Sequence, residues 1–325
     1  MEPVRWGILS TARINSAVIP HLQESPDSEV VAVASRTQER ADEYAGEWGI
    51  PRAHGSYEAL LDDADVEAVY ISLPNGPHVQ WSIHCLEVGK HVLCEKPLAR
   101  YPADVERAFD AAERSGRLLM EAFMWRHHPQ SKRLVELVRG GAIGELRVIR
   151  STFSLTIGDA DVRLDPALAG GALMDLGCYC VSGSRLFGGE PQRVTAYQVV
   201  GPSGVDLRLT AVLTFPRDVL AHFDCAFDLP LRQELEIVGA AGSLYVATPW
   251  GVDEPGIDLR RGGTVERVEV GRGDRYRLQS DNFSRAIRGV EEPLLGREDA
   301  LGQACTIDAL YRSAEAGGEP VHLAR

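Results

Sequence analysis

The chain of 325 residues is longer than one compact core usually organises, which predicts two domains. Its 44% hydrophobic and 25% charged residues give enough apolar surface for a folded core and show no sign of disorder. A formal net charge of -13 argues against a nucleic-acid or anionic-membrane surface, although it leaves room for a local basic pocket.

The cysteines and the N-terminus indicate the cellular compartment. Six cysteines in a chain of this length do not make a disulfide framework, and Cys178 and Cys180 lack the spacing of a zinc or redox motif. We therefore expect no metal site. The first residues run into a strand without a signal segment, and no apolar run reaches the ~20 residues of a membrane span. We expect a soluble, cytoplasmic protein with no membrane partner.

The first third of the chain alternates short apolar runs with polar segments of helical period. The predicted strands are residues 4–9, 30–35, 68–73 and 91–94. The predicted helices are residues 17–23, 37–48, 57–61, 78–87 and 102–115. Strands that are apolar on both faces and alternate with helices are typical of a parallel, doubly wound α/β sheet. We assign residues 1–122 to this domain.

The pattern changes beyond this point, and residues 123–325 predict an α+β domain. A helix is expected at residues 130–139, and closing helices at residues 281–288 and 298–314. The longer, alternating strands are residues 146–153, 193–200, 207–215, 219–227 and 234–238. Alternation of this kind indicates a large, mostly antiparallel sheet with one covered face. Residues 239–243 predict a hairpin turn in that sheet.

The first predicted strand leads into a turn where a dinucleotide-binding fold carries its glycine-rich loop. Of the glycines in that loop, this sequence has only the first, Gly7. Ser10 and Ala12 stand at the other positions where glycine is usual. The turn is either a pyrophosphate site or simply a tight strand-to-helix connection. Arg13 could bind a phosphate group, or it could equally be a solvent-exposed residue of the following helix.

The end of the second strand, Ser35-Arg36-Thr37, favours NADP over NAD. An NAD-binding fold usually places an acidic residue there to accept from the ribose 2′-hydroxyl. A guanidinium and two hydroxyls suit a 2′-phosphate instead. The alternative is that Arg36 and Arg40 only decorate the start of a helix.

Two polar segments follow the next strands, at the edge of the sheet where ligands bind in doubly wound folds. They are residues 73–78 and residues 94–98. Pro97 holds Lys96 in an extended or turn geometry, and the bond between them can be cis. Beside a bound nicotinamide, Lys96 could donate a hydrogen bond to the reacting oxygen. The alternative is a surface charge.

In the second domain, Asp175 and Tyr179 are four residues apart in a helical pattern and share one face. Tyr179 can exchange a proton with the reacting oxygen if a cation such as Lys96 lowers its pKa from about 10. Asp175 can orient a substrate hydroxyl. The plainer interpretation is a charge at a helix start beside a packed ring.

Six segments occur in an order that is far more specific than any one of them: GILSTARI, ASRT, LPNGPH, EKPLA, EAFMWRHHPQ and GGALMDLGCY. Together they resemble the glucose–fructose oxidoreductase and inositol dehydrogenase (Gfo/Idh/MocA) family, from the first strand to at least Phe187. Within that family the chain is most similar to the NADP-dependent xylose dehydrogenases and dimeric dihydrodiol dehydrogenases.

The resemblance implies a Rossmann domain followed by a domain whose large sheet often serves oligomer contact, here in a homodimer or homotetramer. It implies catalytic roles for Lys96, Asp175 and Tyr179, with tyrosine where many members place histidine. Substrate would contact these three residues together with Arg126 and His128. The implied cofactor-binding residues are Gly7, Ser10, Thr11, Ala12, Arg13, Ile14, Ser35, Arg36, Thr37, Arg40, Leu73, Pro74, Asn75, His78, Glu95, Lys96, Pro97, Trp125 and Arg126.

Three functions remain open at this stage. The first is an NADP-dependent dehydrogenase of an aldose, such as xylose, or of a trans-diol. The second is an NADPH-dependent reductase of a keto-sugar, including a nucleotide-linked one. The third is a cofactor-sensing regulator without catalysis, which has no need of an acid/base trio. Residues 158–169 are expected to form a loop that selects the sugar.

Overall fold

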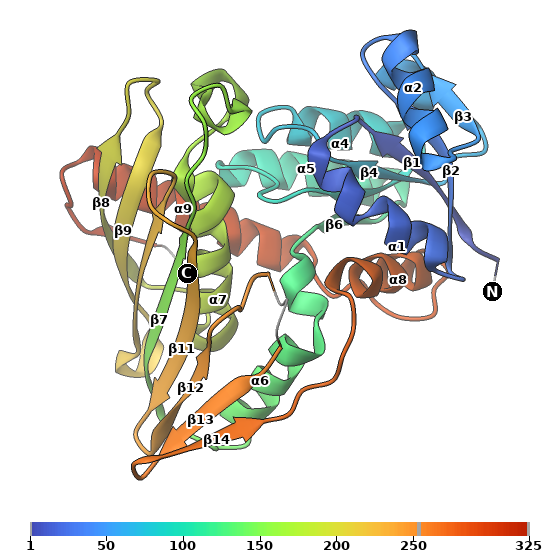
Figure 1. Cartoon of the computed structure of the whole chain (residues 1–325). Coiled ribbons are helices and arrows are strands. Elements are labelled where there is room, and N and C mark those ends of the chain that lie inside the picture. The colour runs from blue at the N-terminus through green and yellow to red at the C-terminus, as the bar shows by residue number, and fades with distance from the viewer. Residues whose placement is uncertain (1, 252–254, 324–325) are drawn as a thin grey trace. The chain divides into compact units, whose positions relative to one another are not determined.

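The computed structural model describes residues 2–251 and 255–323. These residues divide into two compact units, each built from separated stretches of the chain. The first comprises Met1–Ala99, Ala103–Met124 and Asp274–Leu301. The second comprises Arg100–Pro102, Trp125–Gly273 and Gly302–Arg325. Each unit has its own sheet (Figure 1).

Among the described residues, the first unit contains a six-stranded sheet in the order β3-β2-β1-β4-β5-β6. All neighbouring strands run parallel. The strands are β1 (Val4–Leu9), β2 (Ser28–Ala34), β3 (Arg52–His54), β4 (Ala68–Ile71), β5 (His91–Cys94) and β6 (Leu119–Glu121). Chain order reverses between β1 and β4, which is the point where doubly wound folds bind ligands. The predicted parallel sheet is confirmed.

Helices connect these strands, and their ends follow capping chemistry. They are α1 (Ile19–Glu24), α2 (Gln38–Trp48), α3 (Tyr57–Leu61), α4 (His78–Glu87) and α5 (Pro102–Ser115). The Thr37 hydroxyl accepts from the backbone N–H of Arg40 at the start of α2, which satisfies one of the helix's unpaired donors. The Ser56 hydroxyl does the same for Ala59 in α3.

Helix α8 (Arg275–Ile287) comes late in the chain yet belongs to the first unit. The Trp6 indole N–H donates to the Ser284 hydroxyl at 3.3 Å, and the Trp6 ring lies 5.8 Å from that of Phe283. Arg288, which follows the helix, pairs with Glu67 at 2.9 Å. Because Trp6 is fully buried, this packing fixes α8 against β1.

The described part of the second unit contains a nine-stranded sheet in the order β14-β13-β12-β11-β7-β10-β9-β8-β15. Its neighbours are antiparallel except for β7 and β10, which run parallel. The strands are β7 (Leu146–Ser154), β8 (Arg193–Val200), β9 (Asp206–Thr214), β10 (Leu220–Ala226), β11 (Arg232–Gly239), β12 (Gly242–Val246), β13 (Ile257–Arg261), β14 (Thr264–Val268) and β15 (Val321–His322). The predicted mostly antiparallel sheet is confirmed.

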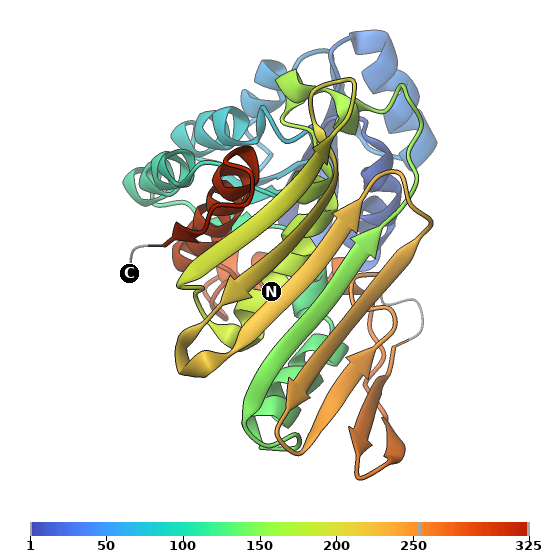
Figure 2. The ribbon, with the colours of Figure 1, turned by 90° about the vertical axis from the view of Figure 1, so that its left-hand side faces the viewer.

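One face of this sheet is covered and the other is open. Helices α6 (Pro129–Arg139) and α7 (Cys178–Gly188) belong to this unit, as does most of α9 (Arg297–Glu315). Side chains at odd positions of β10, such as Phe223, are buried, whereas Leu220 is 45% exposed on the opposite side. Figure 2 shows the open face toward the viewer. The apolar side of β10 that suggested an oligomer contact is therefore the unit's own core.

None of the helices in the described ranges is long and apolar enough to cross a membrane.

Candidate active site

In the turn after β1, Ser10 stands where dinucleotide-binding folds usually have glycine, and its side chain is buried. Ser10 has a φ of 124°, a conformation that glycine adopts far more readily. Its side chain points inward, where the hydroxyl lies 2.8 Å from that of Ser72 and accepts from the Ala12 N–H at 3.2 Å. Only 6% of Ser10 is exposed. The Ser10 side chain is therefore turned into the protein, away from the exposed side of the turn.

Two neighbours explain why the turn keeps this shape. Gly7 lies inside β1, and a Cβ there would stand 3.0 Å from Val66 Cγ1 and 3.1 Å from Leu60 Cδ2, so close packing of these side chains favours glycine. The fully buried Asn15 donates its side-chain amide to the Ser10 carbonyl at 2.8 Å. Asn15 could not be predicted from the sequence, because a single amide five residues beyond Ser10 forms no motif. Arg13 is exposed, and Thr11, Ala12 and Ile14 are partly exposed.

At the end of β2, the two arginines differ in how far they are already engaged. Arg40 pairs with Glu43 at 2.8 Å and lies 5.9 Å over the Tyr44 ring. Arg36 is exposed beside Ser35, and its charge acts on Tyr57 by lowering the pKa that burial raises. Arg36 is therefore the better placed guanidinium for a 2′-phosphate.

The segments after β4 and β5 form two loops at the carboxyl edge of the parallel sheet. Lys96 and Pro97 are joined by a cis peptide bond, which agrees with the geometry that the sequence allowed. The Tyr70 hydroxyl donates to Glu95 Oε1 at 2.6 Å, and the Leu98 N–H donates to Glu121 Oε1 at 2.7 Å. Lys96 thus stands between two anchored residues. Leu73, Pro74 and Asn75 are partly exposed, whereas His78 is fully buried.

Tyr276 of α8 lies near the same loop. Burial raises the pKa of Tyr276, the Glu95 carboxylate adds to that rise, and the Lys96 ammonium opposes it. Its ring is 7% exposed. The sequence offered no signal for this proximity, because nearly two hundred positions separate α8 from β5.

In the second unit, Asp175 lies in a π-helical turn, Leu173–Gly177, that runs into α7. Insertions of this kind occur frequently at functional sites. The Arg163 guanidinium donates to Asp175 at 2.9 Å and makes two further bonds to Asp161. These contacts hold the pKa of Arg163 above its ordinary range, with the Asp161 bonds as the largest cause. Arg163 lies within residues 158–169, the predicted loop, and nothing in the sequence singles it out.

Tyr179 follows one turn later on α7 and is 6% exposed. Its ring meets Phe153 edge to face at 5.5 Å between centroids and lies 5.9 Å from Trp250. Two aromatic neighbours fix the ring plane, so the hydroxyl position is set by packing. Both the acid/base interpretation and the packed-ring interpretation are consistent with this environment.

A buried acid fixes the start of the segment that carries Asp175. Asp206, at the beginning of β9, accepts from the Leu173 N–H at 2.7 Å and from the Tyr311 hydroxyl at 2.8 Å. Burial raises the pKa of Asp206 to about 6, against both hydrogen bonds. A Cβ at Gly171 would collide with this carboxylate. Asp206 therefore requires glycine in the Gly-Gly pair of the motif.

The segment after β6 supplies three further predicted residues, all in the second unit. Trp125 is fully buried and meets Trp250 edge to face at 5.0 Å. Arg126 is partly exposed, and its guanidinium lies 5.8 Å from the Trp125 ring centre. His128 is 2% exposed, and its Nδ1 accepts from the Gln130 N–H as the cap of α6. His128 thus has a clear structural task.

The structure brings the predicted residues together in two sets. The first unit gathers the segments after β1, β2, β4 and β5 at one sheet edge, including Lys96. The second unit holds Arg126, His128, Asp175 and Tyr179. Within residues 2–251 and 255–323, no group of three or more His, Cys, Asp or Glu side chains could hold a metal ion.

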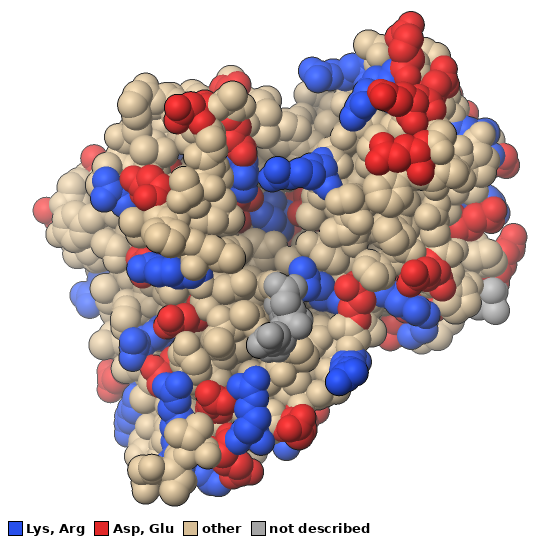
Figure 3. Space-filling model, viewed as in Figure 1, with Lys and Arg blue, Asp and Glu red and all other residues tan. Residues whose placement is uncertain are grey.

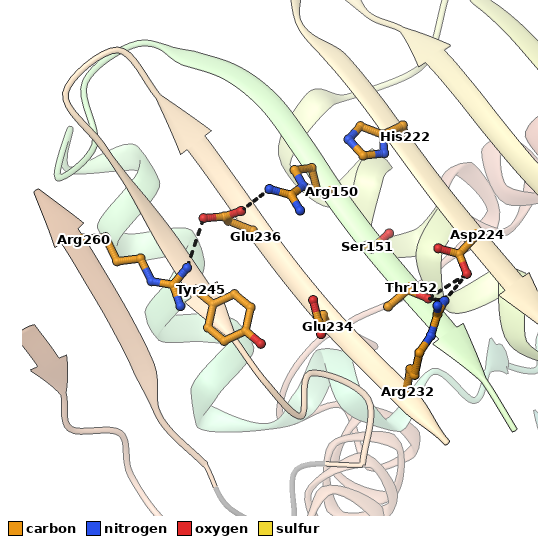
Figure 4. Close-up of a pocket in the computed structure, with 10 residues that line it drawn as sticks. All are labelled: Arg150, Ser151, Thr152, His222, Asp224, Arg232, Glu234, Glu236, Tyr245 and Arg260. Atoms are coloured by element: carbon orange, nitrogen blue, oxygen red, sulfur yellow. Dashed lines mark hydrogen bonds and ion pairs between the residues drawn. The ribbon is translucent and has the colours of Figure 1, made fainter. Parts of the chain in front are cut away.

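A charged hollow of about 420 Å³ lies on the open face of the second sheet. Glu236 accepts from Arg150 at 2.9 Å and lies 3.4 Å from Arg260, while Arg232 pairs with Asp224 (Figure 4). Figure 3 shows acidic and basic side chains interspersed over the lower strands of the second unit. Most charged side chains that line the hollow thus pair with one another.

Family models match most of the chain. A model described as "Oxidoreductase family, NAD-binding Rossmann fold" matches residues 4–123. A model described as "GFO/IDH/MocA C-terminal domain" matches residues 131–245. The two matches cover the parallel sheet and much of the second unit.

Named relatives cover three quarters or more of the chain. D-xylose 1-dehydrogenase (NADP(+)) 2 of Haloferax volcanii is 41% identical over 96% of this chain and 98% of its own. Trans-1,2-dihydrobenzene-1,2-diol dehydrogenase of Homo sapiens is 38% identical over 76% of this chain and 75% of its own. A 3-ketoreductase from Actinomadura kijaniata, solved with NADP and TDP-benzene, superposes with a TM-score of 0.90, at 32% identity over 96% of this chain and 98% of that one.

Proposed function

Since the chain belongs to the Gfo/Idh/MocA family of oxidoreductases, we propose that it is an NADP-dependent dehydrogenase acting on a hydroxyl-bearing carbon of an aldose such as xylose, or of a trans-diol. The similarity to the xylose dehydrogenase over 96% of this chain carries the proposal. Dependence on NADP rests on Arg36, because no acidic residue stands at the end of β2 to repel a 2′-phosphate.

The proposed roles divide the reaction among three residues. When bound, the nicotinamide accepts or supplies the hydride. Tyr179 takes the hydroxyl proton as the alcohol carbon is oxidised and returns it in the reverse reaction. Lys96 favours the phenolate form by its positive charge, and Asp175 orients a second hydroxyl of the substrate. The contact with Arg163 supports this role, because it fixes the direction of the Asp175 carboxyl group.

A reductase of keto-sugars is the second candidate. The 3-ketoreductase whose complex contains TDP-benzene has nearly the same length and fold, which supports a nucleotide-linked substrate. The acid/base chemistry would be the same in either direction. A regulator without catalysis is the third candidate, and the presence of Lys96, Asp175 and Tyr179 together disfavours it.

A substrate panel tests the proposal directly. Aldoses, trans-diols and keto-sugars, free and nucleotide-linked, are assayed by nicotinamide absorbance at fixed NADP or NADPH. Turnover of an aldose or diol with NADP supports the first candidate. Turnover that is confined to keto-sugars with NADPH supports the second. Binding of NADPH without turnover of any compound would leave only the regulator.

We also propose a homodimer or homotetramer through the open face of the second sheet. Exposed apolar side chains on that face include Val212 and Leu220. They share this face with the paired charges around Glu236, because the strand register aligns Glu236, Arg150, His222 and Val212 across neighbouring strands. Such a mixed surface suits a second copy of itself.

A further inference from the structure

His78 lies between the two loops that follow β4 and β5. We name residues 73–77 the Asn75 loop and residues 95–98 the Lys96 loop. The imidazole Nε2 is 2.8 Å from the Leu73 carbonyl oxygen, and Nδ1 is 2.9 Å from the Pro97 carbonyl oxygen. The side chain is 0% exposed, so bulk solvent does not reach these contacts. One ring therefore joins two segments that meet at the ligand edge of the sheet.

Both partners of His78 are carbonyl oxygens, which only accept hydrogen bonds. A neutral imidazole carries one N–H and can donate to one of the two, whereas the protonated ring donates to both. Burial lowers the pKa of His78, the two carbonyls oppose that change, and the Lys96 ammonium adds to it. The lowered pKa favours the neutral ring, which donates to one loop at a time, and only the protonated ring would donate to both.

Other charged groups around this contact are already engaged. Glu95 accepts from the Tyr70 hydroxyl, and Glu121 of β6 accepts from the Leu98 N–H. Pro97, which His78 contacts, lies between these anchors and directly after Lys96. The direction of the Lys96 side chain therefore depends on the backbone position that His78 fixes.

We propose that His78 is a positioning residue that fastens the Lys96 loop to the Asn75 loop. It acts through Lys96 and through the loop backbone rather than by touching substrate. This inference rests on the proposed function only for its effect on turnover. The effects on NADP binding and on the reactivity of Lys96 need no substrate.

The test replaces His78 with Gln, which keeps an N–H donor group but at one end of the side chain only, and with Leu, which has no donor. His84→Gln, an exposed histidine on the same helix, is the matched control. Thermal unfolding first establishes that each variant is folded. NADP dissociation constants and the rate of Lys96 acylation against pH, followed by peptide mass spectrometry, are then measured.

We expect His78→Leu to weaken NADP binding about three- to ten-fold and to change the pH at which Lys96 becomes reactive. His78→Gln should fall between the wild type and His78→Leu, and His84→Gln should match the wild type. In turnover, kcat should fall more than KM rises. A further variant gives a second measurement, because the Lys96 ammonium lowers the pKa of His78: the His78 ring nitrogens followed by NMR should titrate at higher pH in Lys96→Met than in the wild type.

Unchanged NADP binding and an unchanged Lys96 profile in folded His78→Leu would overturn the inference. If the leucine variant does not fold, a His78 titration that is the same in Lys96→Met as in the wild type overturns it equally. Failure of the proposed function would look different: no compound would be turned over by the wild type, while the effects on Lys96 and NADP would persist.

Discussion

Arg163 donates a hydrogen bond from Nη1 to Asp175 Oδ2 at 2.9 Å. Arg163 lies twelve residues before Asp175 in the chain. The same guanidinium is bound twice by Asp161, and it lies 5.5 Å over the Phe227 ring. An arginine fixed by a carboxylate and a ring presents its remaining N–H groups in one direction. Residues 158–169, the loop expected to select the sugar, are thus bonded through Arg163 to Asp175, the residue expected to orient the sugar.

Replacing Arg163 with Gln should lower kcat/KM by about ten-fold or more, because Asp175 loses the partner that directs it. NADP binding should change less than about two-fold, because the change removes no group assigned to the cofactor. Arg147→Gln, which removes an exposed pair with Glu145, is the control. Equal losses in both variants would show that Arg163 has no special role.

Arg36→Ala should narrow the preference for NADP over NAD. A charge-assisted contact to phosphate is worth roughly 1.5 to 3 kcal/mol, which corresponds to about ten-fold or more in affinity. Arg40→Ala should have a smaller effect, because Arg40 already pairs with Glu43. Titration calorimetry with both cofactors measures the gap, and equal dissociation constants in the wild type would end the idea.

Buried histidines should make the fold sensitive to acid. Burial lowers the pKa of His127 to about 3 and that of His91 to about 4. The unfolded chain takes up protons on both below about pH 6.5, whereas the folded chain does not, so stability should fall as the pH drops from there toward 4. Asp206, with its pKa raised to about 6, opposes this by binding its proton first in the folded state.

His127→Phe should reduce the loss of folding stability in acid. Phenylalanine takes up no proton, and the replacement breaks no hydrogen bond of Nε2, which has no partner among the described residues. Urea midpoints measured near pH 7 and pH 5 give the comparison, with His84→Phe as the exposed control. A steeper loss of stability in His127→Phe than in the wild type would contradict the assignment.

The open face of the second sheet should hold two or more copies together. Val212→Lys and Leu220→Lys place charges on a face whose apolar positions are 47% and 45% exposed. Each should shift the oligomer toward monomer, because a buried lysine without a partner is costly. Val265→Lys, on β14 at the end of the strand order, serves as the comparison. A wild type that is strictly monomeric by light scattering at micromolar concentration would count against the proposal.

The sequence predicts the first unit well because its strands are apolar on both faces. The bounds of β1, β5, α3, α4 and α5 agree with the predicted ranges. β14 escaped prediction because four of its five residues are exposed, so no apolar alternation marks it. The prediction for α8 began at residue 281, whereas the helix begins at Arg275. Its buried face includes Gln279 and Ser280, which hides the period.

The residues of the candidate site could likewise be predicted from the sequence only in part. Lys96, Asp175 and Tyr179 stand in short motifs that can be read along the chain. Arg163, Asp206 and Tyr276 act through contacts that close only after folding, and single polar residues in loops or at strand starts give no periodic signal. Positions that support the site from distant segments therefore emerge from the structure alone.

Tyr179→Phe separates the two interpretations of that ring. The phenyl group keeps the contacts with Phe153 and Trp250, so folding and NADP binding should survive. If Tyr179 exchanges the proton, turnover should fall by on the order of 100-fold or more, and Lys96→Met should do the same. In the wild type the oxidation rate should rise with pH through the apparent pKa of the coupled pair, and Tyr179→Phe should lack that rise. Tyr197→Phe, at an exposed ring, controls for loss of a phenol elsewhere. Near wild-type turnover with an unchanged pH profile would make Tyr179 a packing residue, and His128 would be the next group to test as the proton acceptor.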